Sequence, residues 1–179
     1  MTYRFMYTIL CALLLSIVVP TDAHASGFLI QVGPGTQNLP IAVPKPISTS
    51  ANAKLFWDTV QRDLEMTGYF KLLDPDGFID QSNAITPGSF RYEDWRMLKA
   101  SALVKTELIT EGSAVRVDLY LYDVNQGRAI MGKRLKSTKT GVKMLAHRAA
   151  NHIVKSLTGS DAFFGQSIVA VGEKTGNKE

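Results

Sequence analysis

Two segments whose apolar residues recur every three to four positions surround three strand-like segments, and this order most constrains the fold. The first segment carries the spaced positions Leu55, Phe56, Thr59, Val60, Asp63, Leu64 and Thr67. The second carries Val142, Leu145, Ala149, Ile153 and Leu157. This spacing places the apolar side chains on one side of a helix, so each segment predicts an amphipathic helix.

Capping residues predict where the two helices begin and end. Serine and threonine at positions 48–50 are suited to cap the first helix, and Gly68 is suited to end it. Ser137 or Thr140 is expected to cap the second helix, and Gly159 to end it.

Three strand-like runs lie between the helices, at residues 101–110, 114–124 and 128–137. A glycine-containing turn separates each run from the next, which predicts two hairpins and hence a meander. Further strands are predicted at residues 28–32, 39–43, 69–73 and 163–171. The sequence therefore predicts an α/β fold with a mixed five- or six-stranded sheet and two main amphipathic helices packed on one face.

Residues 1–25 predict a signal peptide. Arg4 precedes an apolar run at residues 9–19, and Ala23 and Ala25 supply the small residues that a signal peptidase reads. We expect cleavage between Ala25 and Ser26, which would leave the exported chain in the periplasm without a membrane segment. An uncleaved membrane anchor is the alternative, but the apolar run is shorter than the ~20 residues that a spanning helix needs.

The exported chain would begin with a segment, residues 26–47, that contains the strands predicted at 28–32 and 39–43. Pro44 and Pro46 end the second of these, because proline cannot donate a ladder hydrogen bond. Such a terminal strand is expected at a sheet edge or loose. An edge strand with open backbone groups is a ready site for pairing with another chain.

The charge of the chain does not indicate nucleic-acid binding. Its formal net charge is +4, and the charges are spread out apart from one basic cluster, namely Lys133, Arg134, Lys136, Lys139 and Lys143. Most such clusters are solvated strand or loop faces. No basic residue alternates with aromatic ones, as a nucleic-acid groove would require.

The sequence predicts no enzyme, no cofactor and no metal site. His147 and His152 are five positions apart on a helix, so they point about 140° apart and cannot hold one metal ion together. The acidic pairs at positions 63 and 65 and at 93 and 94 do not face each other on a helix, and we expect solvated charges or caps. Trp57 and Trp95 are expected to pack in the core or at its edge.

Four elements in order resemble a known family. They are PIAVP at 40–44, RDLEMTGYFKLLDP at 62–75, residues 95–104 leading to LYDVNQG at 121–127, and AHRAANHIVKSLTG at 146–159 with Ala162 and Phe163 after it. Together they are similar to the N-terminal domain of TolB, the periplasmic component of the bacterial Tol–Pal envelope system. The resemblance covers nearly the whole exported chain and assigns residues 48–162 to this α/β domain.

The resemblance implies a non-enzymatic protein-interaction module that supports envelope integrity, cell division and protein import. In that family the first strand of the domain engages the inner-membrane protein TolA, and a following propeller contacts the lipoprotein Pal. The corresponding partner-binding residues here are Phe28, Leu29, Ile30, Gln31, Val32, Ile41 and Val43. Residues 163–179 would hold only the start of a propeller and a polar tail, which puts a contact with Pal in doubt.

Three positions depart from the family pattern. Lys45 and Pro46 stand where an apolar, often aromatic residue is usual, and Lys105 stands where a glycine is usual. The alternative function is a stand-alone periplasmic adaptor or binding domain of another envelope assembly. A secreted hydrolase ranks third, because the sequence offers no nucleophile, base or metal constellation.

Overall fold

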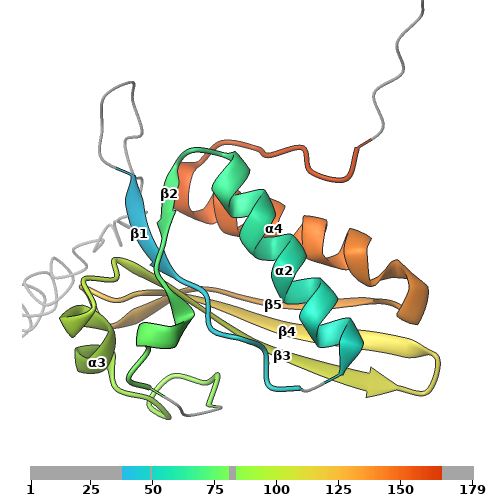
Figure 1. Cartoon of the computed structure of the whole chain (residues 1–179), viewed down its shortest axis with the longest axis horizontal. Helices are drawn as coiled ribbons and strands as arrows, with labels where there is room; N and C mark the ends of the chain where they lie inside the picture. Colours follow the sequence, from blue (N-terminus) through green and yellow to red (C-terminus); the bar gives the residue numbers. More distant parts are fainter. Residues whose placement is uncertain (1–37, 49, 81–83, 167–179) are drawn as a thin grey trace, which may run out of the picture.

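A five-stranded mixed sheet forms the centre of the domain in the computed structural model, which describes residues 38–48, 50–80 and 84–166. The strands are β1 (Leu39–Ala42), β2 (Phe70–Leu72), β3 (Ala102–Glu111), β4 (Ala114–Asp123) and β5 (Arg128–Thr138). The helices are α2 (Ala51–Met66), the short α3 (Tyr92–Met97) and α4 (Val142–Thr158). Figure 1 shows α2 and α4 together on one side of the sheet and α3 on the other. The predicted α/β fold, with two main helices on one face of a mixed sheet, is confirmed.

The strands lie in the order β2-β1-β3-β4-β5. β1 runs parallel to both of its neighbours, whereas β3, β4 and β5 form the predicted antiparallel meander. Residues 163–166, the described part of the strand predicted at 163–171, form no strand. The strand predicted at 28–32 lies outside the described residues. The described sheet therefore has five strands.

β1 corrects one expectation. A strand this close to the N-terminus was predicted at a sheet edge or loose, yet β1 lies between β2 and β3. The prediction was wrong because sequence distance from the terminus says nothing about pairing. The buried side chains of Ile41 and Ala42, both fully covered, instead make an inner position favourable.

Helix α2 begins and ends as its sequence predicts. The side chain of Ser50 accepts a hydrogen bond from the backbone N–H of Ala53 at 3.2 Å, which satisfies a group that the first helical turn leaves open. Gly68 follows the last turn at a φ of +68°, a conformation that costs glycine little. Between these ends the helix buries Ala53, Phe56, Thr59, Val60, Asp63 and Leu64 against the sheet and α4.

Helix α4 starts differently from the prediction. Neither Ser137 nor Thr140 caps it. The Thr138 side chain accepts a hydrogen bond from the N–H of Gly141, and the 3₁₀ turn Lys139–Gly141 leads directly into the helix. The helix then buries an apolar side and ends at Gly159, whose φ is +75°. Together α2 and α4 cover the sheet and enclose the main core.

One polar side-chain contact joins the two helices inside this layer. Asp63 of α2 lies 2.6 Å from Nδ1 of His147 on α4, and the Asp63 side chain is only 3% exposed. The expectation that Asp63 is a solvated charge or cap was therefore wrong. The sequence did carry a signal, because position 63 falls within the apolar spacing of α2.

A smaller aromatic core lies on the opposite face of the sheet, where it was not predicted. Phe78 packs against Trp95 and Phe90 against Tyr122, each pair with ring centroids 5.0 Å apart. Lys105 reaches into this cluster, with Nζ 2.7 Å from Asp80 and 5.0 Å from the centre of the Phe90 ring. The lysine that departs from the family pattern is therefore buried and ion-paired.

Candidate partner-binding surface

The predicted partner-binding residues fall into two groups. Residues 28–32 lie outside the described part of the chain, as does the predicted cleavage site between Ala25 and Ser26. Ile41 and Val43 are described, and their side chains are 0% and 3% exposed within the main core. In this conformation these two side chains contact the domain itself and are not available to a partner.

β1 is held on both sides by backbone hydrogen bonds. The N–H of Leu39 donates to Tyr69 and the N–H of Leu73 donates to Ile41, at 2.9 and 3.0 Å. On the other side the N–H of Ser101 donates to the carbonyl of Pro40 at 2.9 Å. Proline is tolerated in this inner strand because its nitrogen faces β3 just before the β1–β3 pairing starts at Ile41.

β2 forms one open edge of the sheet. Its neighbours Tyr69 and Leu73 turn their backbone groups toward β1, and successive residues of a strand turn opposite ways. The N–H and C=O groups of Phe70 and Leu72 therefore point away from β1, to a side where no described strand pairs. An extended segment from another chain can hydrogen-bond to these groups.

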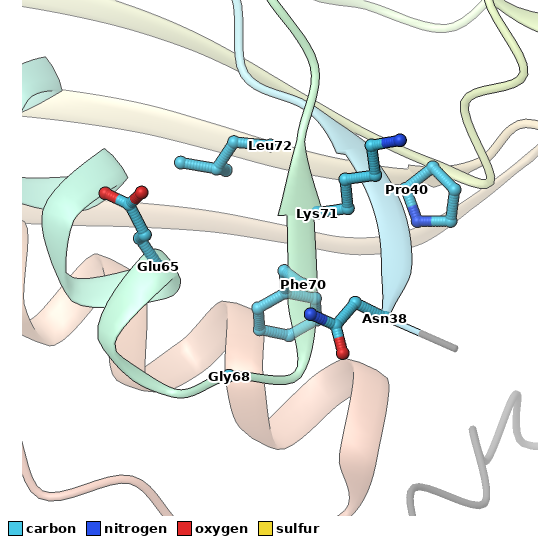
Figure 2. Close-up of a pocket in the computed structure, with 7 residues that line it drawn as sticks. All are labelled: Asn38, Pro40, Glu65, Gly68, Phe70, Lys71 and Leu72. Carbon is cyan, nitrogen blue, oxygen red and sulfur yellow. The ribbon is translucent and has the colours of Figure 1, made fainter. Parts of the chain in front are cut away.

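An open hollow of about 750 Å³ lies at this edge, where the described chain begins. It is lined by Asn38, Pro40, Glu65, Gly68, Phe70, Lys71 and Leu72. Figure 2 shows that Lys71 and Leu72 point to opposite sides of β2, with Glu65 approaching from the end of α2. The hollow thus combines apolar side chains, one charge of each sign and open backbone groups, a composition suited to a short extended peptide.

A second hollow of about 480 Å³ lies at the start of α2. The Trp57 indole there donates to the carbonyl of Val43 at 2.9 Å, and Lys45 Nζ lies 5.4 Å from the centre of the Trp57 ring. The buried Pro46 also lines it. Lys45 and Pro46, which depart from the family pattern, therefore belong to the segment that follows β1 and lie beside α2.

The titratable side chains of the described residues can be set against the geometry that metal and catalytic sites require. The described part of the chain holds no group of three or more His, Cys, Asp or Glu side chains able to bind a metal ion. The His147–Asp63 contact lines neither hollow, so we assign it a structural role. Within the described residues, no helix combines the length and apolar character needed to cross a membrane.

Comparisons with known proteins agree on one family. The model of the TolB amino-terminal domain matches residues 30–130. The Tol-Pal system protein TolB of Syntrophotalea carbinolica is 31% identical over 82% of this chain and 36% of its own length. The TolB of Roseobacter denitrificans is 31% identical over 97% of this chain and 40% of its own length. This chain thus spans less than half of the relatives that it matches.

The same fold occurs in a solved structure. The crystal structure of TolB from Acinetobacter baumannii superimposes with a TM-score of 0.61 at 19% sequence identity, over 71% of this chain and 30% of that one. At this identity the likeness concerns the fold alone.

Proposed function

Because this chain belongs to the TolB amino-terminal domain family, we propose that it is a non-enzymatic protein-interaction module of the Tol–Pal system. The module acts in the periplasm, to which the signal peptide of residues 1–25 directs it. Through protein contacts it supports envelope integrity, cell division and protein import. The relatives of similar sequence are Tol-Pal system proteins, which supports this assignment.

The module offers residues 26–37, together with the start of β1, to an inner-membrane partner of the TolA type. The observation that carries this proposal is the anchoring of β1, which follows directly and is hydrogen-bonded to both β2 and β3. The segment is joined to the domain at Asn38, which lines the hollow at the open edge of β2. Residues 28–32 are apolar enough to add a strand to a partner sheet.

Ile41 and Val43 act in this proposal as anchors and not as contacts. Their side chains are buried in the main core, and this burial holds β1 in place when a partner binds the preceding segment. We assign a contact with Pal to no residue of the described domain.

The test is deletion of residues 26–37 with the signal peptide retained. The periplasmic domain of the TolA-like protein is titrated with each purified chain by calorimetry. We expect binding to be lost, whereas thermal unfolding stays unchanged because every described hydrogen bond of β1 remains. Deletion of the polar tail, residues 172–179, is the matched control and leaves binding intact.

Two results would count against this proposal. Unchanged binding after deletion of residues 26–37 would favour a stand-alone adaptor of another envelope assembly. Loss of binding together with a fall in unfolding temperature would show that the segment is part of the fold and not a free contact.

A further inference from the structure

The outer edge of β5 is long and open. β5 is the last strand of the sheet and pairs only with β4. No described segment forms a strand on its other side, and the strand contains no proline. Its lysines disfavour pairing with a basic strand, so the strand that fits this edge is an acidic one. The register with β4 skips Ile130, so the stretch from Met131 to Thr138, beyond this irregularity, offers a continuous row of backbone groups that another extended chain can pair with.

The charged side chains along this edge are all basic. Between residues 128 and 138 the sequence has four Lys or Arg residues and no Asp or Glu. Lys133 pairs with Leu119 and faces the helix side of the sheet, whereas Lys136 pairs with Arg116 and faces the other side. Positive charge therefore lies on both sides of the open edge, and Lys139 and Lys143 extend it past the end of the strand.

Nearby carboxylates do not neutralise this charge completely. Arg134 forms two hydrogen bonds to Asp118, at 2.7 and 3.0 Å, and these bonds lower the pKa of that carboxyl. Neither Lys133 nor Lys136 forms an ion pair within the described residues. The two lysines are left as the unpaired cations of the edge.

His152, on the neighbouring helix α4, lies in the same positive environment. Burial is the main cause that lowers the pKa of His152 on α4, and the charges of Lys133, Arg148 and Lys155 lower it further. A second positive charge in this region is thus unfavourable, whereas a negative one is favourable.

We propose that the outer edge of β5 binds an extended acidic segment of a partner protein, which joins the sheet as an additional strand. A second copy of this chain is a poor occupant, because two β5 edges would bring their lysines together. β5 and β2 are opposite edges of the sheet. This surface is therefore separate from the hollow beside β2 and goes beyond the function proposed above.

The probe is a short fluorescent peptide of alternating Glu and Val, titrated with the full chain and followed by anisotropy. We expect saturable binding and slower amide hydrogen exchange within residues 128–138 when the peptide is bound. A peptide of alternating Glu and Pro has the same charge but only half of the backbone N–H donors, and its proline rings hold φ at about −65°, away from the extended values of an antiparallel strand. It is therefore expected to bind at least about tenfold more weakly.

Charge-reversal variants locate the binding surface. The double variant Lys133→Glu with Lys136→Glu is expected to weaken binding of the Glu–Val peptide about tenfold or more. The matched control, Lys54→Glu with Arg62→Glu, changes the net charge equally at exposed positions of α2, away from β5 and from the hollow beside β2, and is expected to bind as the unchanged chain does. Circular dichroism melting shows whether each variant is folded, and the Glu–Pro comparison on the unchanged chain needs no variant.

Several results would overturn the proposal. If the Glu–Pro peptide binds as tightly as the Glu–Val peptide, charge attraction alone explains the binding and no strand is added. If both double variants lose the same affinity for the Glu–Val peptide, the net charge of the chain explains the binding. Absence of binding at millimolar peptide would show that the edge does not take an acidic strand. Preference for vesicles of anionic phospholipid over the peptide would assign the edge to a membrane surface. A dimer that Lys133→Glu with Lys136→Glu dissociates would assign it to a second copy of this chain.

Discussion

Replacing His147 by alanine tests whether the contact between α2 and α4 is truly desolvated. The substitution removes the imidazole whose Nδ1 lies 2.6 Å from the Asp63 carboxylate. Asp63 is 3% exposed and His147 is 14% exposed. The variant therefore leaves a carboxylate in the helix layer with little access to water.

The expected cost follows from that burial. Removing the partner of a buried charged group costs about 3–5 kcal/mol, because the remaining carboxylate has lost its hydrogen bond and has little access to solvent. The partial exposure of His147 lets some water enter, so we expect about 3–4 kcal/mol. A typical domain has a total stability of about 5–15 kcal/mol, so the variant should fold but lose a large share of its stability.

The double variant His147→Ala with Asp63→Leu separates charge burial from lost packing. It replaces the pair by apolar side chains of similar combined volume, a change that is often nearly neutral. We expect its free energy of unfolding to lie within about 1–2 kcal/mol of the unchanged chain. The variant His152→Ala is the control on the same helix, because His152 has no ion pair within the described residues.

The assay is urea unfolding followed by far-ultraviolet circular dichroism, with the free energy extrapolated to water. A loss below about 1 kcal/mol in His147→Ala would refute the argument, because it would mean that the Asp63 carboxylate is well hydrated in the folded domain. A double variant that is no more stable than His147→Ala would show that shape, and not charge, decides this contact.

Three further outcomes follow from single contacts. Ser50→Ala removes the cap of α2 and should lower the free energy of unfolding by about 1 kcal/mol. An unchanged free energy of unfolding in a urea titration would show that the cap does not stabilise the domain. The pKa of His152, followed by NMR, should lie below its ordinary value, so the unfolded chain takes up the proton first and stability falls as the pH drops through about 6.5. Lys133→Glu should raise this pKa, and an unchanged titration would contradict the positive environment. Asn151 bonds both backbone groups of Phe164, so Asn151→Ala should speed amide exchange at Phe164 and leave α4 protected.

Local patterns were sufficient to predict the main elements. The apolar spacing of α2 and α4 and the glycine turns of the meander act over a few residues, and each is visible in the sequence. The start of α4 shows the limit of such signals, because Ser137, Thr138 and Thr140 are all plausible caps. Only the folded chain shows that Thr138 reaches Gly141.

Contacts between distant residues could not be predicted in the same way. Lys105 and Asp80 are 25 positions apart, and Asp63 and His147 are 84 apart. Each pair forms only if particular strands or helices are neighbours in space, and local patterns in a single sequence do not show which elements are neighbours. The aromatic core around Trp95 was missed for this reason, since its side chains come from four separate segments.

The inner position of β1 gives the proposed module a mechanical property. A partner that pulls on the segment before Asn38 applies its load to β1, which is bonded to β2 on one side and to β3 on the other. In a parallel arrangement, a pull along the strand loads these hydrogen bonds together, and Ile41 must leave a fully buried site before β1 can slide. An edge strand would lack one of these two ladders. The arrangement that contradicted the expectation of an edge strand is therefore the one better suited to hold a partner at the N-terminal segment.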